Sequence, residues 1–244
     1  MYVRLLGLIV TFPNLMNRAM TERKTWDTIG ANDPYCGTGG PTRAMPLSGK
    51  FAKPDSALLD LVKNKPIVLD LGCGYGRNSL PLHARNENVI ACDVSLAMSR
   101  TVRRAKVPFV LCDLHRLPFR DRSVDCLICS HVLQHVQRRD IGPVLEEIKR
   151  VAKQSLIVMP NPIGVASFFG LKPILHSLAM LKDRMGRKVF ENIPTFRGYI
   201  VNYYLPWSFS ALARLFFDDI KILPGNAGEK LPMYVTNSLL YVCS

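Results

Sequence analysis

Short apolar runs alternate with amphipathic stretches along the middle of this chain. The runs, rich in Val, Ile and Leu, predict strands at Ile67–Leu71, Val89–Cys92, Phe109–Cys112, Val124–Ser130 and Leu156–Met159. The stretches between them predict helices at Arg77–Arg85, Leu96–Ala105 and Ile141–Ala152. Alternating strands and helices form a parallel sheet with right-handed crossovers, and strands this uniformly apolar are buried on both faces.

The pattern changes after residue 159. About sixty residues precede the next strand signal, which is too long for a plain connection and predicts structure of its own. Ile163–Leu181 is apolar enough for one or two helices, and Ser208–Phe217 is expected to be a helix capped by Ser208. Asp219–Leu223 and Ser238–Cys243 predict two final strands. With no helix between them, these two strands are expected to be antiparallel neighbours.

The predicted fold class is α/β: a Rossmann-like, seven-stranded, mostly parallel sheet with helices on both faces, an antiparallel final strand and a helical insert after the fifth strand. We expect a single domain over residues 26–244, with the insert forming a helical cap at about 160–205. Residues 1–25 are expected to be a leader, flexible or dispensable. Its apolar run, Met1–Val10, is too short to span a bilayer and lacks a signal-peptide cleavage site. Met16 or Met20 is an alternative start of translation.

The net charge of +13 results from 32 Lys and Arg against 19 Asp and Glu. The excess is spread over the chain and does not form a basic tail. A spread excess suits an anionic partner such as RNA, or an acidic membrane surface, and it equally fits a basic protein without such a partner. Both interpretations stay open at this stage, as does the oligomeric state.

The chain has seven cysteines, most of them inside apolar runs. This usage indicates buried thiols in a reducing compartment, and therefore a cytoplasmic protein. Cys126 and Cys129 have a spacing that metal and redox sites use. They lie within one predicted strand, however, where residues three apart point to opposite faces. We therefore expect core residues here and no metal site.

A glycine-rich turn, with Gly72, Gly74 and Gly76, follows the first predicted strand. Glycines allow the backbone to approach a ligand closely and to adopt positive φ angles. A dinucleotide site would need its third glycine where Arg77 stands. Asp70, just before the turn, would repel a pyrophosphate. It suits a ligand that carries an ammonium group, as S-adenosylmethionine does.

Two further acids lie at the ends of the next predicted strands. Asp93 ends the second strand, where a carboxylate can accept hydrogen bonds from both hydroxyls of a ribose. Asp113 ends the third, where it can accept a hydrogen bond from an adenine amino group while the Leu114 amide donates to a ring nitrogen. Each acid alone would be read as a cap or turn residue. Together, at the carboxyl ends of neighbouring strands, they predict a ligand site.

From Ile67 to Met159 these motifs resemble the core of the class I S-adenosylmethionine-dependent methyltransferases, in particular the broad family that includes the ubiquinone and menaquinone C-methyltransferases. The resemblance rests on Val68–Gly76, Asp93, Cys112–Phe119 and Ser123–His135. It implies a methyltransferase that uses S-adenosylmethionine as cofactor. The donor-binding residues predicted from the motifs are Asp70, Gly72, Cys73, Gly74, Gly76, Asp93, Val94, Asp113, Leu114 and Ser130.

One part of the family pattern is missing. The family has a glycine-rich turn before its fifth strand, and Val151–Ser155 stands there instead. The departure concerns the geometry of that turn and leaves the predicted fold as it is.

The acceptor side offers fewer candidates. Methyl transfer from a sulfonium is an in-line displacement that needs alignment and the exclusion of water, and it needs a base only when the acceptor must lose a proton. Ser130 and His131, just beyond the fourth strand, are the catalytic candidates. We interpret His131 first as a polar lining residue and second as a base. His135, one helical turn further, is interpreted as structural.

Two segments are expected to cover the site: Trp26–Gly40 and the insert at 160–205. The insert carries the aromatic residues Phe168, Phe169, Phe196, Tyr199, Tyr203 and Tyr204. They are predicted to line an apolar acceptor pocket, to stack on a base, or simply to pack the insert onto the sheet. Asn161-Pro162 is similar to the Asn-Pro pair of amino-group methyltransferases, but it follows the wrong strand and is discounted.

The predicted function is methyl transfer to a small-molecule acceptor, which the apolar Ile163–Leu181 favours. The alternative is an RNA methyltransferase acting on a modified nucleoside. The spread charge favours it, as does the similarity of Cys112-Asp113 and Ser123–Ile128 to the tRNA wobble-uridine carboxyl methyltransferases. The absence of a recognisable RNA-binding module weakens it. A non-catalytic protein that keeps the fold as a scaffold is disfavoured by the intact acids.

Overall fold

The computed structural model of the chain describes residues 13–32, 56–85, 87–162, 193–194, 200–225, 236 and 238–244. These residues include the whole stretch that carries the predicted motifs, apart from residue 86. Most of the predicted insert lies outside the described residues.

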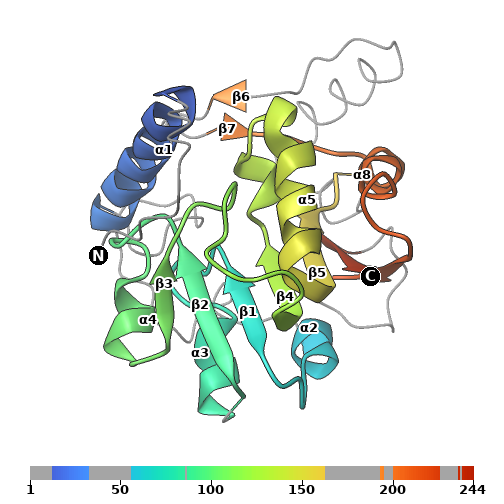
Figure 1. Cartoon of the computed structure of the whole chain (residues 1–244), viewed down its shortest axis with the longest axis horizontal. Helices are drawn as coiled ribbons and strands as arrows, with labels where there is room; N and C mark the ends of the chain where they lie inside the picture. Colours follow the sequence, from blue (N-terminus) through green and yellow to red (C-terminus); the bar gives the residue numbers. More distant parts are fainter. Residues whose placement is uncertain are drawn as a thin grey trace, which may run out of the picture.

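A seven-stranded sheet with the order β3-β2-β1-β4-β5-β9-β8 forms the centre of the fold (Figure 1). Its strands are β1 Val68–Leu71, β2 Val89–Asp93, β3 Phe109–Leu111, β4 Val124–Ser130, β5 Ala152–Pro160, β8 Ile220–Pro224 and β9 Ser238–Cys243. The five N-terminal strands pair in parallel, and β9 pairs antiparallel with both β5 and β8. The predicted fold class is confirmed, including the antiparallel final strand.

Helices cover both faces of this sheet. The helices in the described residues are α1 Pro13–Asn32, α2 Ser56–Leu61, α3 Ser79–Ala84, α4 Arg100–Arg104, α5 Ile141–Val151 and α8 Pro206–Ala213. Buried residues of α5 and α8 belong to one hydrophobic cluster, and those of α2, α3 and α4 to a second. Two short 3-10 turns, η1 Leu133–His135 and η2 Arg138–Asp140, connect β4 to α5.

Side chains of the central strands alternate between these two clusters. In β4, Cys126 and Ile128 belong to the α3 side, while Leu127 and Cys129 belong to the α5 side. This alternation is the period of two that a strand imposes. The prediction that Cys126 and Cys129 are core residues on opposite faces is confirmed.

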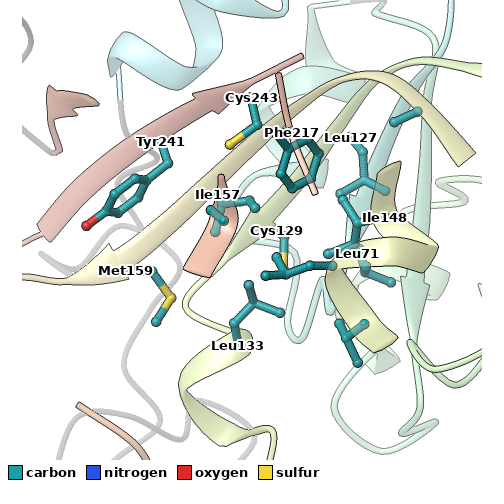
Figure 2. Close-up of a cluster of buried hydrophobic side chains, with 14 of the residues drawn as sticks. Leu71, Leu127, Cys129, Leu133, Ile148, Ile157, Met159, Phe217, Tyr241 and Cys243 are labelled. Atoms are coloured by element: carbon teal, nitrogen blue, oxygen red, sulfur yellow. The ribbon is translucent and has the colours of Figure 1, made fainter. Parts of the chain in front are cut away.

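The cluster on the α5 side is the larger of the two. Figure 2 shows side chains from several strands and from α5 meeting there, among them Leu71, Cys129, Ile148, Ile157 and Tyr241. The apolar residues of α5 form one buried stripe that packs on the sheet: Ile141, Val144, Leu145, Ile148 and Val151. The buried stripe holds α5 against the sheet. Helix α5 thereby forms the crossover between the parallel strands β4 and β5.

Several predicted boundaries were wrong. Helix α4 begins at Arg100, four residues later than predicted, and α8 ends at Ala213 instead of Phe217. Helix α5 ends at Val151 and β5 begins at the next residue, so the chain enters the strand directly and the expected turn does not exist. Helix α8 starts at Pro206 with Leu205 as its N-cap, and Ser208 lies inside the helix. Proline suits the first helical position because its φ is already helical and its missing N–H would have no partner there.

The N-terminal helix crosses the boundary predicted at residue 26. Helix α1 begins at Pro13, so the second half of the expected leader is helical and continuous with Trp26. In the described part of the predicted insert, β6 Ile193–Pro194 and β7 Ile200–Val201 form a small antiparallel pair. The apolar stretch Ile163–Leu181 lies outside the described residues. None of the helices described is long and apolar enough to cross a membrane.

Burial in this core leads to a first prediction. Replacing Ile148, which is fully buried on α5, with alanine is expected to lower the free energy of unfolding by about 2–5 kcal/mol, because the cavity adds to the lost transfer energy. The matched control is Leu215→Ala, since Leu215 is 75% exposed and its truncation should change stability by no more than about 0.5 kcal/mol. Urea denaturation of both variants measures the difference. Equal losses would contradict this assignment of the core.

Candidate functional site

The glycine turn connects the end of β1 to α3 in a conformation that suits glycine. Gly72, Gly74 and Gly76 have φ angles of 69°, 51° and 94°. Side chains with a Cβ rarely adopt these values, because the left-handed region brings the Cβ against the backbone. Three glycines therefore allow the chain to turn sharply between the end of β1 and α3.

Neighbouring side chains also leave no room for a Cβ at two of these glycines. A Cβ on Gly72 would contact the Val132 side chain, just after β4. A Cβ on Gly76 would lie 2.6 Å from Cγ2 of Val102 and 2.7 Å from Cγ of Leu80. The turn is thus held between the end of β4 on one side and the helices α3 and α4 on the other.

Asp70 lies beneath the turn and is almost fully buried, with 1% of its surface exposed. Its carboxylate accepts a hydrogen bond from the Ser79 hydroxyl at the start of α3. Burial raises the pKa of Asp70 above its usual value, and the hydrogen bonds from Ser79 and Asn78 oppose that rise. Asp70 therefore ties β1 to the first turn of α3. A contact between this carboxylate and a bound ligand remains a prediction.

Asp93, the last residue of β2, lies against the glycine turn. Its Oδ2 accepts a hydrogen bond from the Gly74 amide at 2.8 Å, and its Oδ1 accepts one from the Ser95 amide at 2.8 Å. Burial raises the pKa of Asp93 to about 6, with a further contribution from Asp70, although both amide hydrogen bonds act in the opposite direction. Each oxygen retains a second lone pair with which it can accept a hydrogen bond from a ligand.

Asp113 was predicted to end the third strand. Strand β3 ends at Leu111, so Asp113 lies two residues beyond it. Its Oδ1 accepts a hydrogen bond from the His115 amide at 2.9 Å and lies 2.6 Å from Nδ1 of the same histidine. His115 was not predicted as a site residue, since no sequence motif distinguishes a histidine two residues after an acid. The Leu114 side chain packs against the α5-side core. The hydrogen bond from the Leu114 amide to a ring nitrogen of adenine remains a prediction.

Ser130 and His131 mark the end of β4. Ser130 is paired with Val158 of β5, and the His131 amide donates a hydrogen bond to the Val158 carbonyl at 2.9 Å. His131 has a φ of 57°, a left-handed conformation that turns the chain sharply away from the sheet. Burial, with a smaller contribution from the nearby Arg77, lowers the pKa of His131 to about 4. The imidazole is therefore neutral at physiological pH.

His135 connects three segments of the chain. Its Nδ1 lies 2.9 Å from the Ile200 carbonyl of β7, and its Nε2 lies 3.2 Å from the Gln134 amide nitrogen. A ring with its proton on Nδ1 satisfies both contacts. The Trp26 ring of α1 packs edge-on against it, with the ring centroids 5.1 Å apart. These contacts support the structural role predicted for His135.

The segments expected to cover the site are described in part. In α1, Trp26 packs on His135 and Asp27 contacts Ser95 after β2, whereas residues 33–40 lie outside the described residues. Tyr204 is 3% exposed and packs against Phe209 of α8, which supports the packing interpretation of that aromatic. The predicted aromatics Phe168, Phe169, Phe196 and Tyr199 lie outside the described residues. Asn161 donates to the Thr236 carbonyl at 2.9 Å, in keeping with its being discounted.

The carboxyl ends of β1, β2 and β4 meet at one edge of the sheet. In the parallel register, Leu71 lies level with Cys92 and with Cys129, so Asp93 and Ser130 extend to the same height. The strand order reverses between β1 and β4, and open α/β sheets bind ligands where it does. In the part of the chain that is described, no three His, Cys, Asp or Glu side chains are grouped so as to hold a metal ion.

A family model described as "Methyltransferase domain" matches residues 69–158, which is less than half of the chain. The matched stretch runs from β1 to β5 and contains the glycine turn and all three acids. This match confirms, for these residues, the resemblance predicted from the motifs.

Two curated relatives show how far the similarity extends. The demethylmenaquinone methyltransferase of Streptomyces griseus is 34% identical over 142 residues, which cover 57% of this chain and 61% of that protein. The malonyl-[acyl-carrier protein] O-methyltransferase of Yersinia pestis is 34% identical over 103 residues, or 41% and 38% of the two chains. The chain thus spans well under two thirds of the length of either relative.

Among solved structures, a SAM-dependent methyltransferase from Methanosarcina mazei superimposes with a TM-score of 0.56. The sequence identity is 16%, and the superposition covers 78% of this chain and 96% of that one. At this level of identity the likeness shows the fold alone, and it supports the sheet order described above.

The glycine turn gives a second prediction. Gly76→Ala is expected to destabilise the protein by at least about 2 kcal/mol more than Gly74→Ala, since its Cβ would overlap two branched side chains whereas a Cβ on Gly74 meets only the end of Met98 at 3.6 Å. Both variants bear the strain of a positive φ, about 1–2 kcal/mol. Chemical denaturation of the pair isolates the steric part. Equal stability of the two variants would show that the packing around Gly76 is looser than described.

Proposed function

We propose, from the class I methyltransferase domain that residues 69–158 form, that this protein transfers a methyl group from S-adenosylmethionine to a small-molecule acceptor. One observation carries the proposal. The Asp93 carboxylate and the Gly74 amide are joined at 2.8 Å on the edge where the strand order reverses. An acid fixed against a glycine turn can hold a ribose, and the buried Asp70 beneath the same turn favours a ligand with a positive charge over a pyrophosphate.

The described residues fit this cofactor. Asp93 would accept hydrogen bonds from the ribose hydroxyls, Asp113 and Leu114 would face the adenine, and the turn from Gly72 to Gly76 would leave room for the methionine part. When bound, S-adenosylmethionine supplies a methyl group on a sulfonium, which is ready for in-line displacement. Asp70 and Asp93 together provide the negative charge that favours a cationic ligand at this edge.

His131 and Ser130 are proposed to face the transferred methyl group. A neutral imidazole adds no positive charge beside a sulfonium, so the lowered pKa of His131 suits a lining residue at this position. A pKa of about 4 also makes His131 a weak base, since general bases work best with a pKa near the operating pH. The proposed role is therefore alignment of the acceptor and exclusion of water.

A small-molecule acceptor is supported by the name of one relative. The Streptomyces griseus protein is a demethylmenaquinone methyltransferase. The Yersinia pestis protein is a malonyl-[acyl-carrier protein] O-methyltransferase, whose named acceptor is carried on a protein. The six described cysteines are all free, which supports the predicted cytoplasmic location.

The alternative acceptor is RNA, and one surface favours it. Between Asp93 and Asp113 there is no acidic residue, while the basic residues Arg100, Arg103, Arg104 and Lys106 are all exposed on or just after α4. Such a surface attracts polyanions in a salt-dependent way. Its position beside the proposed donor site makes an RNA substrate the second candidate.

The third prediction concerns donor binding. S-adenosylmethionine is expected to bind the wild type with an affinity that falls about tenfold per pH unit below pH 6, because ribose hydroxyls donate to the ionised form of Asp93 and its pKa is about 6. Asp93→Ala is expected to bind much more weakly and without this pH dependence. Isothermal titration, with thermal unfolding as the folding control at each pH, measures both. A folded wild type that does not bind would refute the proposed function.

The fourth prediction concerns the acceptor. With a methyl-labelled donor, label is expected in lipid or small-molecule extracts and not in total tRNA. Label that appears in tRNA, and is lost when Arg103 and Arg104 are changed to Glu, would instead establish the RNA alternative. The matched control is Arg139→Glu, which reverses the charge of an arginine outside the basic stretch on α4.

A further inference from the structure

We propose that helix α1 is part of the donor site and that Asp27 of this helix is a positioning residue for the ribose-binding acid Asp93. The inference rests on the proposed function. It concerns a helix outside the matched domain, in which Asp27 lies 42 residues before the start of the match at residue 69. The structure connects the two acids through a single intermediate residue, Ser95.

The connection consists of three hydrogen bonds. Oδ1 of Asp27 accepts from the Ser95 hydroxyl at 2.6 Å and from the Ala97 amide at 3.2 Å. The Ser95 amide in turn donates to Oδ1 of Asp93 at 2.8 Å. Ser95 is fully buried, whereas 35% of the Asp27 side chain is exposed. The orientation of the Asp93 carboxylate thus depends on a residue that Asp27 holds in place.

Asp27 also completes the turn that follows β2. Within that turn the Met98 amide donates to the Ser95 hydroxyl oxygen at 3.1 Å, and the Ser99 hydroxyl donates to the Ser95 carbonyl at 2.9 Å. Asp27 satisfies the Ala97 amide from outside the turn, much as an N-cap side chain satisfies the first amides of a helix. Without it, this donor would face the packed surface of α1, where an unmade hydrogen bond is costly.

The backbone of α1 lies unusually close to the same turn at Gly30. A Cβ on Gly30 would lie 2.6 Å from the Met98 nitrogen and 2.8 Å from the Ala97 carbonyl carbon. A glycine at this point therefore lets the helix approach the turn backbone directly. Met98 lies 3.6 Å from the position of a Cβ on Gly74, so the turn touches both α1 and the glycine turn.

A second contact holds α1 from the other side of the site. The Trp26 ring packs on His135, which follows β4. Trp26 and Asp27 are adjacent, so one stretch of α1 joins the segment after β2 to the segment after β4. Figure 1 shows α1 beside the sheet, with one end near the β6–β7 pair and the other toward α4. Helix α1 therefore contacts both sides of the edge between β2 and β4, where the donor is proposed to bind.

The charge of Asp27 is maintained under working conditions. Burial alone would raise its pKa, but the hydrogen bonds from Ser95 and Ala97 and the charge of Arg23 lower it below its usual value. Arg23 lies 3.5 Å from Oδ2, the oxygen that Ser95 and Ala97 do not use. The two oxygens of Asp27 thus have separate partners, and this separation makes a discriminating experiment possible.

The fifth prediction uses two substitutions at Asp27, with S-adenosylhomocysteine binding measured by titration calorimetry. Asp27→Ala removes both acceptor contacts and is expected to raise the Kd roughly tenfold, the loss of about one hydrogen bond to a charged group. Asp27→Asn keeps an acceptor oxygen for Ser95 and Ala97, and its Kd should stay within about threefold of wild type. Arg23→Ala, the control for the ion pair alone, should bind as wild type does.

A readout specific to positioning is the dependence on the ribose. For a ligand without the ribose 2′ and 3′ hydroxyls, Asp27→Ala is expected to cost much less affinity, because the contacts that Asp93 would make are already missing. Equal losses with both ligands would show that Asp27 stabilises the fold in general, and would overturn the proposal. So would an Asp27→Asn variant that binds as weakly as a folded Asp27→Ala variant.

A measurement on the wild type keeps the proposal testable if Asp27→Ala does not fold. Binding of S-adenosylhomocysteine should slow amide hydrogen exchange in Pro13–Asn32 as well as in the turn after β2. Exchange that slows in the turn but not in α1 would overturn the inference and leave the proposed function intact. A wild type that does not bind the ligand at all would instead remove the proposed function on which the inference rests.

Discussion

The Asp93 carboxylate is the group on which the arrangement of this edge depends. Both of its oxygens accept backbone amides, one from the glycine turn after β1 and one from the turn after β2. A buried charge of this kind is tolerated only where its partners are fixed. The two turns must therefore keep their relative position for the acid to remain satisfied, and the segments that pack on them inherit that constraint.

The parallel register explains why a single acid can organise so much. β2, β1 and β4 end at nearly the same level, so the chain leaves the sheet three times within a small area. The backbone conformation differs at these three points. Glycines with positive φ follow β1, a capped turn follows β2, and a histidine in the left-handed conformation follows β4. The packing of Val132 against Gly72 joins the first and third of these exits.

Local pattern was enough to predict the individual strands, the glycine turn and the position of Asp93 at the end of β2, because each depends on residues close in sequence. The end of β5 and the strands β8 and β9 followed from apolar runs in the same way. Contacts between distant segments could not be predicted. In the sequence, Asp27 does not differ from other acids on the surface of a helix, and only the structure places Ser95 beside it. The direct passage from Val151 into β5 depends on how α5 packs on the sheet. The predicted start of α8 at Ser208 was wrong because Pro206, which suits the first helical position, begins the helix two residues earlier.

The two cysteines of β4 have a consequence beyond their place in the core. Cys126 and Cys129 are three residues apart, yet one is covered by the α2–α3–α4 layer and the other by the α5 layer. Burial raises the pKa of Cys126 to about 12 and that of Cys129 well above its usual range, so neither thiol reacts while its layer is closed. The strand thus carries two natural chemical reporters. Their separate alkylation rates would tell whether the two helical layers detach from the sheet together or one before the other.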